Sequence, residues 1–326
     1  MSKDKVFTQK LELENNTTRI HASLSSMNEL MEIASAKIDQ EYSGTMPRNS
    51  ILESSCEFNG RKTLPQTIQI YLDGWKEGME KLASTTLDIK NLANRVENLA
   101  YKFSDSNGLE LDIGLFLSGE PECWIKEPDP DEEDGQSTKK NKIVPIAIPI
   151  SYYCMWNTDQ IFRRGQAIIS IIDGIEATGR QCELFGILNH NKLTLTVPLK
   201  KAGEYISPER IIYTLGHPSF LRRILFSLLE HTNKELRNSE GYTNNGSYSS
   251  TREISSQILA QLPELKPLCF DRATGENILL NLCSGTGSNP STFSSDDSAL
   301  KWTLQTLQTH GVQIELSAKE KKLLAA

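Results

Sequence analysis

The chain has 326 residues, and its 42 acidic side chains outnumber its 35 lysines and arginines to give a formal net charge of −7. A composition of 38% apolar and 24% charged residues is that of an ordinary globular protein and excludes a disordered or fibrous chain. The net charge argues against a uniformly basic coat for nucleic acid. A local basic groove stays open, because contact with phosphates depends on where charges cluster.

No segment has the character of a membrane span or a secretory signal. The longest apolar run, 143–156, is too short to cross a bilayer and contains Pro145 and Pro149. Residues 1–14 are rich in Lys and Glu and lack the apolar stretch of a signal peptide. The cysteines are scattered without a C-x-x-C pair, which is typical of small buried side chains in a cytosolic protein. We therefore expect a cytoplasmic protein without membrane contact.

The amino-terminal part has mostly helical spacing. Apolar residues between 17 and 40 recur at the intervals of one helix face. A second helix is predicted to begin near Pro65, since proline is tolerated in a first turn, and to be broken into two pieces by Gly74 and Gly78. The leucines and valine of 87–99 predict another helix. Residues 1–125 are thus predicted to form a helical amino-terminal region.

An acidic run followed by lysines occupies residues 126–142. This segment has almost no apolar side chain, so it cannot bury enough surface to offset the entropy of ordering. We expect a flexible, solvated loop here. Docking of a partner, or mimicry of nucleic acid, is the alternative that the charges leave open.

Residues 143–326 are predicted to form an α/β domain. A short apolar run predicts a buried strand, although its two prolines favour an edge or a bulge. Helical and strand-like periods then alternate in the order strand, helix, strand, strand, helix. These elements are expected over 143–150, 159–177, 182–188, 193–199 and 208–231, and a late helix and a last strand over 300–310 and 312–316. The predicted fold is α/β, with a central mixed sheet and flanking helices.

Motifs for catalysis and metal binding are missing. The histidines have no partner at helical spacing and no Glu-x-x-His context. The glycine-rich run 284–288 lacks the lysine and the strand-to-helix setting of a phosphate-binding loop. We expect no catalytic residues, no metal ion and no cofactor. An enzyme without a recognised motif is the alternative.

Three stretches of the α/β region, 148–153, 162–167 and 175–186, resemble the opening β-α-β unit of von Willebrand factor A-type domains. In that family the first strand ends in an Asp-x-Ser-x-Ser metal motif, whereas the loop here offers only Ser151 before Asp159. The resemblance implies a degenerate von Willebrand A-like fold without the metal. Because A-type domains often work with an AAA+ ATPase, it also implies a protein–protein adaptor.

A second resemblance spans more of the chain. Its motifs are Phe58-x-Gly60, Gly74-Trp75-x-Glu77-Gly78, Gly119-Glu120-Pro121 and Arg164-Gly165. These are similar to an uncharacterised family of tailed phages and their prophages. Size and layout are also similar to the single-stranded-DNA-binding transcription factors of schitoviruses. That resemblance implies a host-cell cytoplasmic protein that recruits a phage RNA polymerase to middle promoters.

Basic and aromatic residues gather around the α/β unit. Single-strand binders combine a basic groove with aromatic faces on which bases stack. The candidate nucleic-acid-binding residues are Tyr152, Tyr153, Trp156, Arg163, Arg164, Lys200, Lys201, Arg222 and Arg223. In the alternative interpretation the aromatic residues pack in the core and the basic pairs are solvated helix ends. The leading expectation is a non-enzymatic single-stranded-DNA-binding protein that recruits a polymerase, with the adaptor as the second.

Overall fold

The computed structural model of the chain describes most of the α/β region and parts of the amino-terminal half. The described residues are 9–14, 18–36, 57–84, 102–104, 110–111, 124–126, 143–152, 156–190, 193–204, 207–230, 253–270, 275, 277–284 and 289–325. The expected flexible loop at 126–142, apart from Lys126, lies outside them. So do Tyr153 and the helix expected at 87–99.

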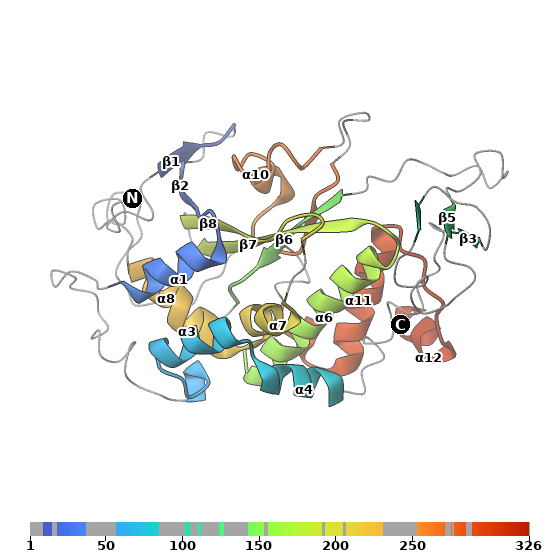
Figure 1. The fold of residues 1–326 in the computed structure, drawn as a ribbon, viewed down its shortest axis with the longest axis horizontal. Coiled ribbons are helices and arrows are strands. Elements are labelled where there is room, and N and C mark those ends of the chain that lie inside the picture. Colours follow the sequence, from blue (N-terminus) through green and yellow to red (C-terminus); the bar gives the residue numbers. More distant parts are fainter. Residues whose placement is uncertain are drawn as a thin grey trace.

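A six-stranded mixed sheet forms the centre of the molecule (Figure 1). In spatial order its strands are β1 (Gln9–Glu12), β2 (Thr18–Ser23), β8 (Leu193–Lys200), β7 (Gln181–His190), β6 (Ile143–Pro149) and β9 (Leu280–Asn281). Strand β6 runs parallel to β7 and β9, β2 runs parallel to β8, and the pairs β1–β2 and β7–β8 are antiparallel. A second sheet consists of β3 (Lys102–Ser104), β5 (Trp124–Lys126) and β4 (Glu110–Leu111). The predicted α/β class with a mixed sheet is confirmed.

The two prolines of β6 are explained by its neighbour β9. The carbonyl of Ala147 accepts a hydrogen bond from the N–H of Leu282 on the β9 side. Residues two apart along a strand direct their backbone groups to the same side, so Pro145 and Pro149 also face β9. Since β9 pairs only with Ile146 and Ala147, the missing N–H groups break no ladder hydrogen bond.

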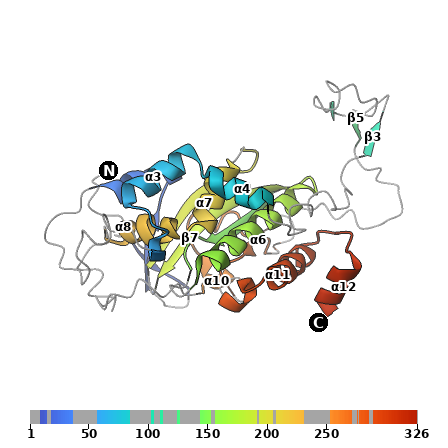
Figure 2. The ribbon, with the colours of Figure 1, turned by 90° about the horizontal axis from the view of Figure 1, so that it is seen from below.

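Most helices lie on one face of the sheet, which is the lower face in Figure 1. They are α1 (Met27–Ser35), α6 (Thr158–Glu176), α7 (Pro208–Gly216), α8 (Phe226–Glu230) and α11 (Asp296–Thr309). Helices α3 (Leu64–Asp73) and α4 (Lys76–Ser84) lie on the outer side of α7 (Figures 1 and 2). The remaining elements are the short helices η1 (Glu57–Asn59), α10 (Ser256–Leu259) and η6 (Pro290–Phe293), the π-helical turn η4 (Phe220–Leu225) and α12 (Ala318–Ala325).

Helix α6 shows why the local prediction worked. Asn157 caps its first turn, and the Gln160 side chain returns a bond to the Asn157 N–H in a capping box. Its isoleucines Ile161, Ile168 and Ile175 recur at helical spacing and are buried. With β6 before it and β7, β8 and α7 after it, α6 completes the strand, helix, strand, strand, helix order expected over 143–231, which is confirmed.

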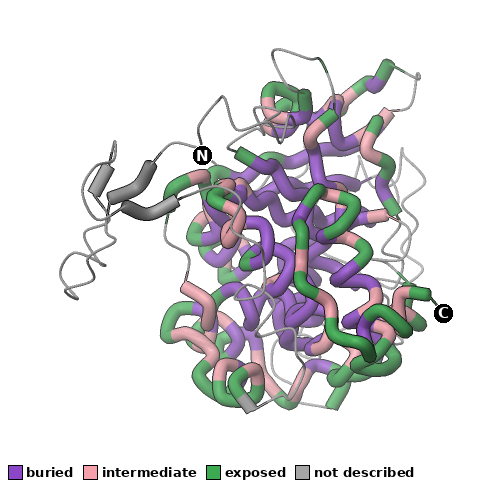
Figure 3. Tube along the Cα trace, turned by 90° about the vertical axis from the view of Figure 1, so that its right-hand side faces the viewer, coloured by how far each residue is buried: buried purple, intermediate pink, exposed green. Residues whose placement is uncertain are grey.

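The sheet separates two apolar cores, seen as buried segments in Figure 3. Alternation along β6 sends Ile146 and Ile148 into the larger core under the helices and Ala147 into the smaller one. The smaller core is closed by the segment 253–270, which contains α10 and lies on the other face of the sheet (Figure 1). The central strands β6 and β7 are thus covered on both faces, whereas β1 at the sheet edge is mostly exposed.

The expected helix over 17–40 was wrong in its first half. Residues Thr18–Ser23 form strand β2, which lies between β1 and β8. The Ser26 side chain accepts the Glu29 N–H and begins α1 only at Met27. Apolar spacing could not separate the two elements, because Ile20 and the α1 residues all face the same core. The region 1–125 therefore contains strands as well as helices.

Two further sequence predictions had different outcomes. The break between α3 and α4 at Gly74 is confirmed, and its φ of 83° suits glycine, whereas Gly78 breaks nothing and lies within α4. The last strand over 312–316 was wrong in its extent, since these residues add no strand to either described sheet and only Ile314 forms an isolated β-bridge. They follow α11, with the Val312 N–H bonded to the Leu307 carbonyl. Alternating apolar residues form a strand only where pairing extends along a neighbouring strand, and here the pairing is limited to the single bridge at Ile314.

Candidate functional site

The aromatic residues expected to stack on bases lie inside the protein, just beyond β6. Tyr152 is 4% exposed and Trp156 is 2% exposed. Their rings stack with centroids 6.2 Å apart and planes 22° apart. The Tyr152 hydroxyl donates to the Pro218 carbonyl at 3.0 Å, and burial raises the pKa of Tyr152. In this arrangement neither ring offers a free face to a base.

Arg222, on the π-helical turn η4, continues this stack outward. One guanidinium nitrogen donates to the Phe58 carbonyl and another to the Trp156 carbonyl, the latter at 3.0 Å. The guanidinium carbon lies 4.0 Å from the Phe58 ring centroid and 5.5 Å from that of Tyr152. The order Phe58, Arg222, Tyr152, Trp156 therefore forms one column, of which Phe58, 46% exposed, is the outer end. We call it the Phe58 column.

Arg223 fixes the loop before α3. Its Nε donates to the Lys62 carbonyl at 2.9 Å, so two consecutive buried arginines hold the segment 57–63 against η4. That segment turns at Gly60, with φ of 65°, and at Arg61, with φ of 56°. Interruptions of a helix by π-helical turns are often found at functional positions, and here the turn aims both arginines at one loop.

Arg164 lies behind the column, on α6. It is 1% exposed and donates to the Pro149 carbonyl at the end of β6. Burial lowers the pKa of Arg164 to about 10. Its neighbour Gly165 makes room for the helix crossing, since a Cβ atom there would lie 2.9 Å from the Gly216 Cα atom of α7.

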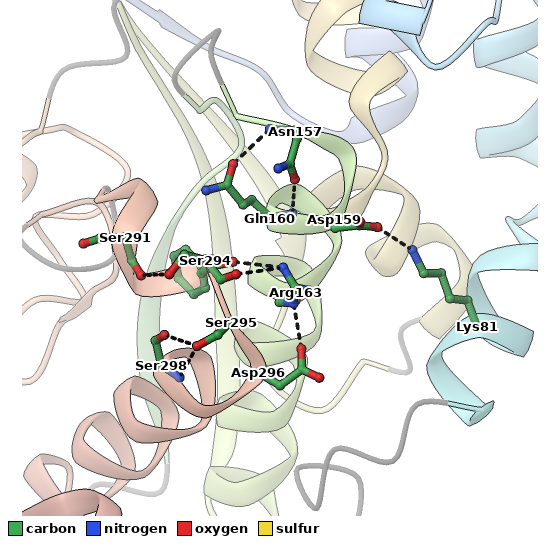
Figure 4. Close-up of polar contacts among 11 residues, drawn as sticks. Lys81, Asn157, Asp159, Gln160, Arg163, Ser291, Ser294, Ser295, Asp296 and Ser298 are labelled. Carbon is green, nitrogen blue, oxygen red and sulfur yellow. Dashed lines mark hydrogen bonds and ion pairs between the residues drawn. The ribbon is translucent and has the colours of Figure 1, made fainter. Parts of the chain in front are cut away.

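Arg163 of α6 points toward η6 and α11 (Figure 4). Its Nε bonds to Asp296 at 2.6 Å, and another nitrogen donates to the Phe293 and Ser294 carbonyls. Gln160, one turn earlier, donates to the Pro290 carbonyl. These contacts hold the start of α11 against α6 and leave Arg163 only a quarter exposed.

The two lysines lie at the other end of the sheet. Lys200 is buried and donates to Glu176 and to the Cys182 carbonyl near the amino end of β7. Lys201 is exposed. The structure thus brings Tyr152, Trp156 and Arg222 into one column, with the other described candidates in separate places. The eight candidates that the structure describes do not share one outer surface.

A second buried network was missed by sequence reasoning. The Ser219 hydroxyl lies 2.7 Å from His217 Nδ1 and 2.7 Å from the Tyr213 hydroxyl. Burial, with Lys62, lowers the pKa of His217 to about 3. Ser219 is fully buried, so this serine and histidine stabilise the break after α7 and do not face a substrate. The sequence motif that touches this network is Phe58-x-Gly60. A Cβ atom on Gly60 would come 2.9 Å from the His217 ring, so the glycine leaves room for that ring.

Three buried donors near the end of β6 have no acceptor within the described structure. They are the Ser151 hydroxyl, the Trp156 indole N–H and the Nη1 of Arg164. Buried polar groups in folded proteins are nearly always hydrogen-bonded, and a buried donor left without an acceptor costs about 1–3 kcal/mol. These three groups leave unused hydrogen-bonding capacity near the carboxyl end of β6.

Across the described ranges, no three His, Cys, Asp or Glu side chains come together in a way that would hold a metal ion. None of the described helices combines the length and the apolar character needed to cross a membrane. No curated protein and no solved structure matches the chain significantly. Residues 10–302 match the family described as "Domain of unknown function (DUF7192)", which covers most of the chain. The chain therefore belongs to this DUF7192 family.

Proposed function

We propose that this chain is a non-enzymatic protein–protein adaptor that works in the cytoplasm. The observation that carries the proposal is that three arginines predicted to contact DNA form hydrogen bonds inside the protein. Arg164, Arg222 and Arg223 donate to carbonyls of the chain itself, so they join layers of the fold. A rigid scaffold whose cations are used internally is better suited to present an outer surface to a protein than to neutralise phosphates.

Phe58 is the residue that we propose as an anchor for the partner. Its ring is 46% exposed, yet it rests on the Arg222 guanidinium and its carbonyl is bound by the same side chain. An exposed aromatic ring held in one position loses little entropy when a partner covers it, and such rings often dominate interface energies.

The partner that we propose is an AAA+ ATPase. The support for this choice is the resemblance of 148–153, 162–167 and 175–186 to von Willebrand A-type domains, which often serve such ATPases. If the chain is phage-encoded, it would act in the cytoplasm of the host cell. An AAA+ gene adjacent to the gene of this chain would supply the protein to test.

The test compares Phe58→Ala with Leu72→Ala, because both side chains are 46% exposed and only Phe58 belongs to the column. Binding to the purified ATPase is measured by biolayer interferometry, with the melting temperature of each variant as a check of folding. We expect Phe58→Ala to weaken binding by about tenfold or more, which is about 1.4 kcal/mol, and Leu72→Ala to leave it unchanged. Equal effects of the two substitutions would contradict the proposal.

Single-stranded-DNA binding with recruitment of a phage RNA polymerase is the second candidate. The observation that favours it is the same exposed Phe58 ring, since single-strand binders stack bases on aromatic side chains supported by arginine. Lys201, exposed at the far end of the sheet, lies apart from this ring. A gene for a phage RNA polymerase subunit beside this one would favour recruitment over the adaptor.

A further inference from the structure

Ser151, Trp156 and Arg164 share a chemical character that points to a ligand. Each presents a hydrogen-bond donor without an acceptor in the described structure, and each is at most 5% exposed. All three belong to the connection that leaves β6 or to the first turns of α6. The groups missing there are therefore acceptors, not further donors.

The charge of Arg164 leads to the same conclusion. Its guanidinium donates to the Pro149 carbonyl, and no ion pair joins it to a carboxylate within the described ranges. The ionisable neighbours that Arg164 influences are Tyr152 and Cys283, and burial raises the pKa of both, which keeps them neutral. A buried cation without a nearby opposite charge raises the free energy of the folded protein. An anion bound beside it would recover part of that free energy.

The position in the fold is one where α/β proteins bind ligands. Strands β6 and β9 are parallel neighbours, so the loops that follow them leave from the same end of the sheet. The loop after β9 carries Cys283, whose ionisation the charge of Arg164 affects. In open sheets the crevice beyond the carboxyl ends of adjacent strands is the usual ligand position. The amino end of α6, with its partial positive charge, follows β6 through the connection that carries Ser151 and Trp156.

We infer that Ser151, Trp156 and Arg164 form a binding site for one small oxyanion, the phosphate or carboxylate group of a ligand. The anion accepts from the three donors and neutralises the guanidinium. This site is separate from the outer face of Phe58, so it does not depend on the proposed adaptor function.

The test uses the full chain and inorganic phosphate as the probe, with acetate as the carboxylate arm and potassium chloride at equal ionic strength as the reference. Melting temperature is followed by differential scanning fluorimetry, and the Kd is measured by isothermal titration calorimetry. A ligand that binds only the folded state raises the melting temperature in a saturable way. We expect phosphate or acetate to do so beyond the effect of chloride, and the larger shift identifies the preferred group.

Arg164→Met removes the charge and keeps most of the volume, so we expect the anion-dependent shift to disappear while the melting temperature without anion does not fall. Arg163→Met is the matched control, because the adjacent arginine is paired with Asp296 and should leave the shift intact. Ser151→Ala keeps the charge of Arg164 and should weaken anion binding several-fold. This second variant still tests the inference if Arg164→Met does not fold. The inference is overturned if neither anion shifts the melting temperature, or if the shift persists in both the Arg164 and Ser151 variants.

Discussion

Gly165 of α6 and Gly216 of α7 meet backbone to backbone where the two helices cross. A Cβ atom on Gly165 would lie 2.9 Å from the Gly216 Cα atom and 3.0 Å from its nitrogen. This close approach brings Phe162 and Tyr213 of the two helices under Trp75, which contacts both rings edge-on. The glycine of the Arg164-Gly165 motif therefore has a packing reason that does not involve a ligand.

Gly165→Ala should destabilise the chain by about 1–3 kcal/mol, because the added methyl group meets rigid backbone and forces the helices apart. Gly174→Ala on the same helix is the control, since its methyl group would meet only the end of the Leu307 side chain. Alanine also favours a helix over glycine, which offsets part of any strain at 174. Urea unfolding of both variants makes the comparison, and equal losses would show that the helix crossing is not the tight contact described.

Removal of the Arg222 side chain should loosen the loop 57–63 from η4. We expect Arg222→Met to cost about 2–4 kcal/mol of unfolding free energy, because two hydrogen bonds from a buried charge are lost. Arg210→Met is the control, since Arg210 also donates to a carbonyl, that of Leu72, but is exposed. That variant should change stability by about 0.5 kcal/mol or less. Chemical denaturation followed by tryptophan fluorescence measures both, and similar values would argue against the clamp.

Stability should depend on pH through His217. Its Nδ1 accepts the Ser219 N–H, so the folded state holds the neutral ring, with its pKa lowered to about 3 by burial and Lys62. The unfolded ring has a pKa of about 6.5, so between these values the unfolded state binds the extra proton. Stability therefore falls as pH falls from about 6.5 toward 3, with a contribution of about 1.4 kcal/mol per pH unit. His217→Asn should flatten this slope in denaturation curves at pH 4, 5 and 6, and an unchanged slope would contradict the prediction.

The nucleic-acid hypothesis makes a prediction that the adaptor does not. If the Phe58 ring stacks a base, Phe58→Ala should cost about 1–3 kcal/mol of single-strand affinity and leave the salt dependence nearly intact. Lys201→Ala should reduce the salt slope if it neutralises a phosphate. Fluorescence anisotropy with a labelled single strand at several salt concentrations, beside duplex of the same sequence, measures both. Equal, weak binding to the two forms, unchanged by either substitution, would leave the adaptor as the better proposal.

Local signals determined the elements around the candidate site. The capping residues Asn157 and Gln160, the spacing of the α6 isoleucines and the break at Gly74 all act within a few residues. The first half of the expected 17–40 helix and the expected last strand failed because both decisions depend on a neighbouring strand. Such a neighbour is present for Thr18–Ser23 at β8, and the segment 312–316 has none in either described sheet.

The sequence by itself determined that Tyr152, Trp156 and Arg222 are suited to stacking and to charge-assisted hydrogen bonds. Only the tertiary structure decided that they stack on one another. The Arg222–Trp156 bond joins residues 66 positions apart, and the Arg222–Phe58 bond joins residues 164 apart. Periodicity and capping carry no information over such separations. Whether a guanidinium meets a phosphate in solvent or a carbonyl in the interior is therefore determined by how the layers pack.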